Sequence, residues 1–84
     1  MTQLALSFDP YPPNPFPHGT QKAMVFEIIL NRGEACMPDF LRAGIPEFRS
    51  RIAEMEKVLR PLGWTIHHRR QHGSKYVFYS IGRE

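Results

Sequence analysis

The chain has 84 residues, with 42% hydrophobic residues, eleven Lys and Arg, eight Asp and Glu, and a formal net charge of +3. The length predicts one domain with a small core, and the apolar content is that of a folded protein, not of a disordered one. The single cysteine excludes an internal disulfide framework and fits a reducing cytosol. The pI near 9.4 is a small argument for an acidic partner such as nucleic acid.

Two further features of the sequence bear on location. We find no apolar run long enough to span a bilayer, so we expect no membrane association. The first residues, MTQLALSFDP, lack the basic n-region and the long apolar h-region of a signal peptide. We therefore expect a cytoplasmic protein.

Residues 1–18 form a proline-rich arm that differs in composition from the domain predicted for residues 19–84. Five of the eight prolines lie in this arm, and such a run favours an extended, polyproline-like conformation. The arm also holds Phe8, Tyr11 and Phe16. It could be a loose tail, an arm packed on its own domain or on a second copy, or a proline-rich ligand for another protein's aromatic groove. We favour the packed arm, because three aromatic side chains are costly to leave in water.

Residues 20–33, TQKAMVFEIILNRG, predict the first helix. Thr20 is the expected N-cap, and Gly33 offers the left-handed exit of a helix end. An i, i+3, i+4 stripe of Val25, Ile28 and Ile29 forms the predicted buried side.

The link that follows, residues 34–37, is a candidate for a brief strand paired with a later hairpin. Cys36 in this link is expected to be a small buried hydrophobe and not a nucleophile, because the sequence places no base beside it.

Residues 36–63, CMPDFLRAGIPEFRSRIAEMEKVLRPLG, predict two helices joined by a tight turn. Pro38 fits the first turn of the shorter helix, and Gly44 fits its left-handed end. Pro46 is expected to begin the longer helix in the same way, and Pro61 to stop it. One apolar stripe at spacings of four, three and four marks the buried side of the longer helix: Phe48, Ile52, Met55 and Leu59.

Such a pair is a candidate helix-turn-helix. An α-helix fits the major groove of DNA, and the N-terminal half of the helix then reaches base edges. The residues placed to do this are Glu47, Arg49, Ser50 and Arg51. The same pattern also suits a solvated helix face, so the helix pair alone does not decide between these readings.

Residues 64–81 predict a β-hairpin, with arms WTIHHRR and KYVFYSI and a turn at Gln71-His72-Gly73-Ser74. Alternation along the strands assigns five side chains to the core: Trp64, Ile66, Val77, Tyr79 and Ile81. Phe78 falls on the outer face, where the N-terminal arm could cover it.

The hairpin tip is the most basic stretch of the chain. Nine residues hold six basic or titratable side chains and no acid: His67, His68, Arg69, Arg70, His72 and Lys75. A basic hairpin next to a recognition-type helix can lie along phosphates or enter the minor groove, and its binding would depend steeply on salt. We expect contacts to DNA from Arg69, Arg70, His72 and Lys75, against the alternative of a solvated basic loop.

Other chemistry finds little support in the sequence. His67 and His68 point to opposite faces of a strand and cannot readily share one ion, and no second cysteine or acidic cluster is near in sequence to complete a tetrahedral shell. We find no glycine-rich phosphate loop, triad pattern or paired-carboxylate constellation. We expect no metal, no cofactor and no enzymatic activity.

The order of these elements resembles that of the small winged helix-turn-helix proteins of bacteriophages, prophages and bacteria. The matching stretches are TQKAMVFEIILNRG, AGIPEFRSRIAEM and LGWTI, and the resemblance covers residues 19–81. One departure is that residues 56–62 lengthen the interval between R-I-x-E and G-W by about one helical turn. The proline-rich arm also lies outside the family pattern.

The resemblance implies an α+β fold of three helices and a C-terminal β-hairpin, here with the proline-rich arm. It also implies sequence-specific binding to double-stranded DNA by a small transcriptional regulator. Arg49, Ser50 and Arg51 would then lie in the major groove, and the wing residues Arg69, Arg70 and Lys75 on phosphates.

Winged helices also bind proteins, so the fold alone does not fix the function. The alternative is a protein-interaction module, such as a phage-encoded inhibitor or adaptor acting on a host nucleic-acid machine. The residues that favour it are Phe8, Tyr11, Phe16 and Phe78. A homodimer stays open under both hypotheses.

Overall fold

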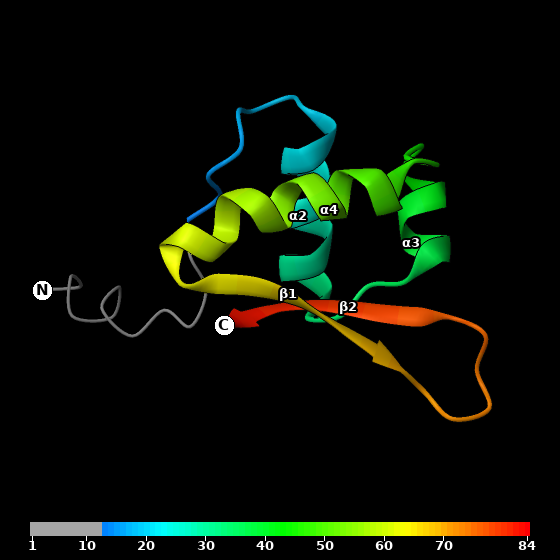
Figure 1. Ribbon diagram of the computed structural model, residues 1–84. Helices are drawn as coiled ribbons and strands as arrows, with labels where there is room; N and C mark the ends of the chain where they lie inside the picture. Colours follow the sequence, from blue (N-terminus) through cyan, green and yellow to red (C-terminus); the bar gives the residue numbers. More distant parts are fainter. Residues whose placement is uncertain (1–12) are drawn as a thin grey trace, which may run out of the picture.

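The computed structural model describes residues 13–84, in which three α-helices precede an antiparallel β-hairpin (Figure 1). The elements in chain order are α2 (Gln21–Arg32), α3 (Met37–Arg42), α4 (Phe48–Leu59), the 3₁₀ turn η1 (Arg60–Leu62), β1 (Trp64–Arg70) and β2 (Val77–Arg83). The helices cover one side of the hairpin, and the hairpin tip extends beyond them (Figure 1). This small α+β fold confirms the predicted class and is compatible with a winged helix. Within residues 13–84, no helix combines the length and apolar character needed to cross a bilayer.

Local chemistry sets both ends of α2 as predicted, and a carboxylate that the sequence analysis did not single out sets the start of α3. The Thr20 hydroxyl accepts a hydrogen bond from the Ala23 N–H at 3.2 Å and caps α2. Gly33 has φ +82° and donates its N–H to Ile29 at 2.8 Å, which ends α2. The Asp39 carboxylate accepts the Cys36 N–H at 2.9 Å and fixes the start of α3.

The predicted start of the longer helix is wrong by two residues. Pro46 lies in the turn before α4, because Glu47 has φ −96° and ψ 33°, outside the helical region, and regular helix begins at Phe48. The predicted stop is confirmed. Helix α4 ends at Leu59, and Pro61 lies in η1.

The first strand has the predicted bounds, whereas β2 begins and ends two residues later than predicted. The register pairs Arg70 with Val77, which leaves a loop of residues 71–76. Within this loop the Tyr76 N–H donates to the Ser74 hydroxyl at 3.1 Å. The brief strand expected in residues 34–37 is present as a bridge in which Ala35 and Tyr79 exchange hydrogen bonds at 3.0 and 2.8 Å.

An aromatic cluster joins the helices to the hairpin. Phe40 of α3 stacks on Phe48 of α4 with ring centres 5.0 Å apart, and Tyr79 of β2 meets both rings edge-on at 6.0 and 6.2 Å. The whole predicted stripe of α4 is buried, as are Ile66, Tyr79 and Ile81 of the hairpin. Trp64 and Val77, also predicted in the core, are half-buried at its margin.

The described part of the arm packs on its own domain. Phe16 is 7% exposed and meets Phe26 of α2 edge-on at 5.8 Å. The Asn14 amide donates to the Ala23 carbonyl at 3.2 Å and to the Glu27 carboxylate at 3.0 Å. Phe16 therefore packs on its own domain, which is one of the arrangements that the sequence analysis favoured. The packed ring has little surface left for a partner. Phe8 and Tyr11 lie outside the described residues.

Candidate nucleic-acid interface

One side of α4 faces α2 and carries charges that neutralise each other. The Arg51 guanidinium lies 3.6 Å from Glu47 and 3.4 Å from Glu54. Lys22 of α2 lies 3.3 Å from the same Glu54 carboxylate. Arg51 is therefore held between two carboxylates, on a side of the helix that already has its counter-charges.

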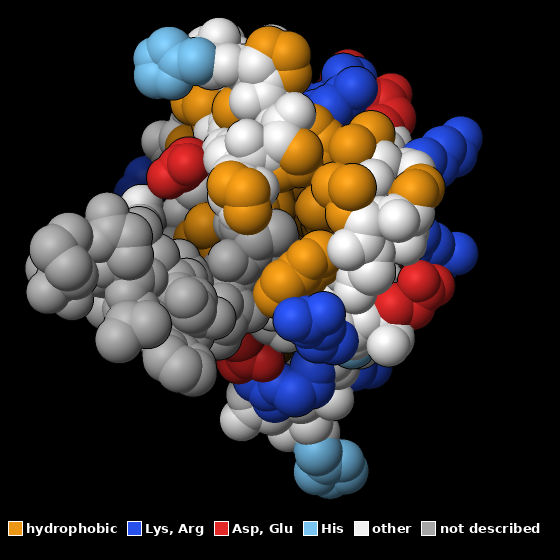
Figure 2. All heavy atoms as spheres, turned by 90° about the vertical axis from the view of Figure 1, so that its left-hand side faces the viewer, with side chains coloured by type: hydrophobic (Ala, Val, Ile, Leu, Met, Phe, Trp, Pro, Cys, Tyr) orange, Lys and Arg blue, Asp and Glu red, His pale blue; other side chains and the backbone are white. Residues whose placement is uncertain are grey.

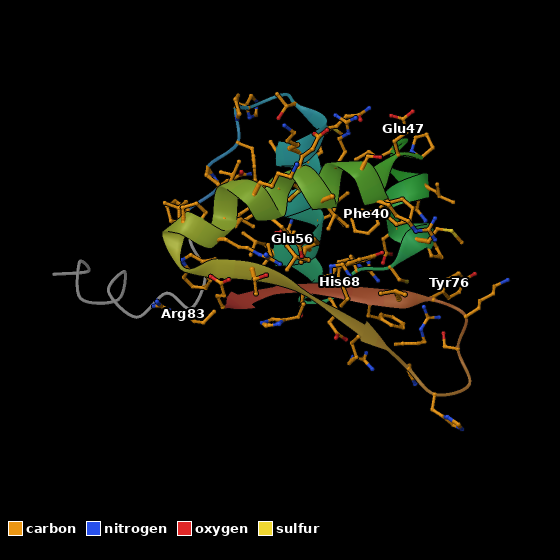
Figure 3. All side chains as sticks on the ribbon, viewed as in Figure 1. Phe40, Glu47, Glu56, His68, Tyr76 and Arg83 are labelled. Carbon is orange, nitrogen blue, oxygen red and sulfur yellow. The ribbon has the colours of Figure 1, made fainter. Side chains whose placement is uncertain are left out.

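A second side of α4 faces solvent and carries no acid. Its exposed residues follow one another at helical spacing: Arg49, Ser50, Ala53 and Lys57. The remaining carboxylate of α4, that of Glu56, turns to the hairpin and lies 3.2 Å from His68 Nε2 (Figure 3). The Glu47 and Glu54 carboxylates thus lie against Arg51 and the Glu56 carboxylate lies against His68, and the exposed row of Arg49, Ser50, Ala53 and Lys57 holds two cations and no acid.

A cationic hollow of about 400 Å³ lies where the N-terminal half of α4 meets the hairpin. Arg49, Arg70 and Lys75 line it from α4, the end of β1 and the hairpin loop. None of these three side chains forms an ion pair with a residue in the range 13–84. The Arg49 guanidinium lies 5.2 Å from the centre of the Phe48 ring, and the Lys75 ammonium 5.5 Å from that of Tyr76.

Arg69 has a different environment from its neighbour Arg70. Its guanidinium donates two hydrogen bonds to the Glu34 carboxylate, at 2.8 and 2.7 Å, and lies 4.9 Å over the Phe78 ring. The hydrogen bond from Arg69 holds the pKa of Glu34 below its usual value, and the same bond raises the pKa of Arg69. Successive residues of a strand point to opposite faces, which is why the two arginines have different surroundings.

The structure therefore brings together part of the predicted DNA-binding set. Arg49, Arg70 and Lys75 share one hollow, with Ser50 exposed beside them and His72 exposed at the hairpin tip. The other predicted contacts are engaged elsewhere, in ion pairs with described residues: Glu47, Arg51 and Arg69.

The predicted set of DNA contacts omitted three residues of this surface. Ala53 and Lys57 continue the exposed side of α4, and Tyr76 lines the hollow. The spacing of four and eight residues from Arg49 could have identified the first two. No comparable signal existed for Tyr76, because its place depends on where the hairpin loop ends.

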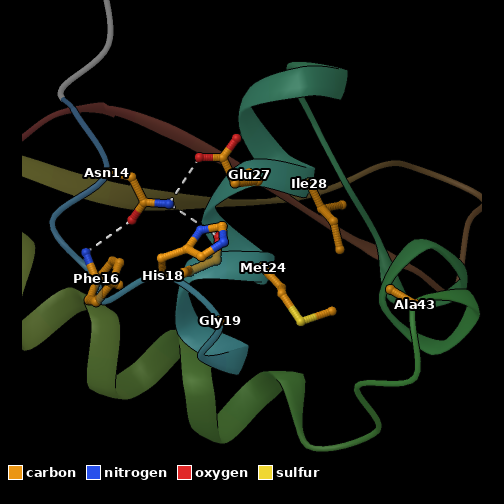
Figure 4. Close-up of a pocket in the computed structure, with 9 residues that line it drawn as sticks. Asn14, Phe16, His18, Gly19, Met24, Glu27, Ile28 and Ala43 are labelled. Atoms are coloured by element: carbon orange, nitrogen blue, oxygen red, sulfur yellow. Dashed lines mark hydrogen bonds between the residues drawn. The ribbon is translucent and has the colours of Figure 1, made fainter.

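A separate groove of about 720 Å³ runs between the arm and α2 (Figure 4). Met24 and Ile28 of α2 line it together with Phe16, His18 and Ala43. Hydrophobic side chains also gather on the face that Figure 2 shows, which includes the C-terminal end of α4. In that part of the chain, Val58 and Leu62 are 41% and 56% exposed.

Cys36 is half-buried and not fully buried as predicted, and it lies beside a carboxylate that the sequence analysis did not place there. Burial is the largest cause that raises the pKa of the Cys36 thiol, and the nearby Asp39 carboxylate adds to it. The thiol donates to that carboxylate at 3.7 Å. His68 faces α4, whereas the ring of His67 lies over Gly82 on the opposite face of the hairpin.

Comparison of the chain with protein-family models, with curated proteins and with solved structures found no match.

Proposed function

We propose that the chain binds double-stranded DNA as a winged helix-turn-helix module. The solvent side of α4 enters the major groove, and the basic hairpin lies on the phosphate backbone. The single observation that carries this proposal is the convergence of Arg49, Arg70 and Lys75, without ion pairs to described residues, where helix and hairpin meet.

The dimensions of α4 support a groove-binding role. From Arg49 to Lys57 the helix rises about 12 Å, which is comparable with the width of the major groove. Arg49 and Ser50 supply hydrogen-bond donors for base edges at the N-terminal half, where a recognition helix reaches the bases. The acid-free side of the helix avoids repulsion from phosphates along this length.

The biological setting follows from the resemblance of the sequence to small phage and bacterial regulators. We propose that the protein regulates transcription in the cytoplasm, where an unpaired cysteine such as Cys36 is stable. A symmetric dimer on a two-fold site is the usual arrangement for helix-turn-helix proteins, and a solution mass measurement would test it.

The test is duplex binding measured by fluorescence anisotropy at several salt concentrations. We expect the affinity to fall steeply with salt, with a slope of about 0.9 per phosphate contact. Replacing Arg49, Arg70 and Lys75 together by Gln should lower this slope by about two to three units.

Arg83→Gln is the matched control, because it removes one cation from the opposite end of the hairpin (Figure 3). It should leave the slope nearly unchanged. A slope near zero for the wild-type protein would refute the proposal.

The second candidate function is a protein-interaction module that docks on a host nucleic-acid machine. The groove beside Met24 and Ile28 favours it, because the apolar side chain of Met24 is 41% exposed there. If no duplex is bound at low salt, this candidate replaces the first. Met24→Asp should then abolish association with the partner.

A further inference from the structure

The floor of the cationic hollow is apolar and aromatic. It consists of Met37, Phe48, Tyr76, Val77 and Tyr79. Phe48 and Tyr79 belong to the aromatic cluster and are only 2% and 6% exposed, so this part of the floor is fixed by the core. Tyr76 is half-buried and lies beside the start of β2 (Figure 3). The floor is therefore a firm apolar surface with one accessible ring.

The rim of the same hollow has the opposite character. Arg49, Arg70 and Lys75 surround it with three positive charges that no described carboxylate neutralises. A phosphate alone would make no favourable contact with the apolar floor. An apolar ligand would leave the three cations without a counter-charge. A group that joins a flat ring to a phosphate suits both, and a nucleotide is such a group.

The size of the hollow agrees with this chemistry. At about 400 Å³ it lies in the range of sites that hold small molecules. A base stacked inside a duplex cannot reach a protein pocket, whereas an unpaired base can leave the stack at low cost and lie on an aromatic side chain.

We propose that the hollow holds one unpaired nucleotide, so that the preferred ligand is a duplex with a single-stranded overhang. This inference rests on the proposed DNA binding and narrows its substrate. The base stacks on Tyr76, and its phosphate lies among Arg49, Arg70 and Lys75.

The local backbone makes Tyr76 available for this role. Its N–H donates to the Ser74 hydroxyl at 3.1 Å, and Tyr76 precedes the first paired residue of β2, Val77. The Lys75 ammonium lies over the ring, 5.5 Å from its centre, so a stacking base would displace this flexible side chain toward the phosphate.

The experiment compares two duplexes with the same paired segment, one blunt and one with an overhang of three nucleotides. The overhang carries 2-aminopurine, whose fluorescence falls when the base stacks on an aromatic ring. We expect wild-type protein to bind the overhang duplex about tenfold more tightly than the blunt one and to quench the probe. Tyr76→Ala should reduce this ratio to near one and remove the quenching.

Two control variants separate stacking from other effects. Tyr76→Phe keeps a ring at the site and should keep the preference. Phe78→Ala removes a ring from the face of β2 opposite to Val77 and Tyr79 and should also keep it, because Phe78 does not line the hollow. Circular dichroism establishes that each variant is folded.

Two results would overturn the inference. Equal affinity for the two duplexes, with a steep salt slope for both, would refute the nucleotide site and leave DNA binding standing. A preference for the overhang that survives Tyr76→Ala would refute the stacking role. Absence of binding to either duplex would instead refute the proposed function itself.

Discussion

Two sides of the same helix carry similar residues and differ in what surrounds them. On the side of α4 that faces α2, Arg51 lies between Glu47 and Glu54. On the solvent side, where the N-terminal half of α4 meets the hairpin, Arg49 lines the hollow with two further cations and no described acid. The hairpin repeats the contrast, since Arg69 is bound by Glu34 whereas Arg70 lines the hollow. The surface that could bind an anion is therefore identified by which basic residues lack an ion pair, and not by how many basic residues there are.

The geometry of the elements explains why neighbouring cations separate so cleanly. Residues two apart on a helix point about 200° from each other, and adjacent residues on a strand point to opposite faces. A run such as Arg49-Ser50-Arg51 or Arg69-Arg70 therefore offers about one cation to each side. The opposite side then needs carboxylates, and this chain supplies them from α4, from its N-cap and from the link before α3.

The largest expected effect comes from removing one ring of the aromatic cluster that holds α4 against the hairpin. Phe40 is fully buried and touches both Phe48 and Tyr79. Phe40→Ala should lower the free energy of unfolding by about 3–5 kcal/mol, because a large ring leaves a cavity. Urea unfolding measures the change. Leu41→Ala on the same helix, at a side chain that is 46% exposed, should cost far less. Equal losses for the two variants would mean that the aromatic cluster does not organise the interface.

Local rules were sufficient for most of the fold. Caps at Thr20 and Gly33 and the buried stripe of α4 depend on residues a few positions apart, so the sequence predicts them correctly. The errors lie at Pro46 and at both ends of β2. These boundaries depend on one backbone conformation at Glu47 and on the pairing register of the two strands, neither of which is a property of a short window.

The candidate site could be predicted only in part, for the same reason. The spacing of Glu47 and Arg51 by four residues is a known signal for an ion pair and could have removed Arg51 from the predicted contacts. Glu34 and Arg69 are 35 residues apart, and no local pattern in the sequence predicts their contact. The convergence of Arg49 with Arg70 and Lys75 likewise depends on tertiary structure. That these residues contact DNA remains a prediction.

A second prediction tests the comparison directly on the hairpin. Arg70→Gln should reduce the salt slope of duplex binding by about one unit, because one phosphate contact is lost. Arg69→Gln removes the same charge from the next residue and should change the slope much less, since Glu34 already neutralises Arg69. Anisotropy titrations at several salt concentrations measure both. If Arg69→Gln had the larger effect, the division between paired and unpaired cations would be wrong.

A third prediction concerns acid stability and the Glu34–Arg69 pair. The pKa of Glu34 is lower in the folded chain than its ordinary value of 4.5, because Arg69 donates to the carboxylate. The pair therefore stabilises the fold above about pH 4.5, and this contribution is lost as the pH falls through the folded-state pKa. We expect Glu34→Gln and Arg69→Gln to flatten the same acidic part of the stability profile, measured by thermal unfolding between pH 7 and pH 3. Profiles identical to that of the wild-type chain would show that the pair has no such role.

The smallest expected effects lie on the paired side of α4. A double-mutant cycle of Lys22→Met and Glu54→Gln should give a coupling energy of about 0.2–1 kcal/mol, because both side chains are well exposed. Glu54→Gln also releases Lys22 and Arg51 from a shared carboxylate, which makes this side more positive by one charge.

If DNA lies on the other side of α4, Glu54→Gln should change the duplex affinity less than Lys75→Gln does. The first variant adds one net positive charge beside α2, and the second removes one from the hollow. Both affinities are measured at the same salt concentration. A larger change from Glu54→Gln would place the nucleic acid against α2. The carboxylates that pair Arg51 would then act on the binding surface itself.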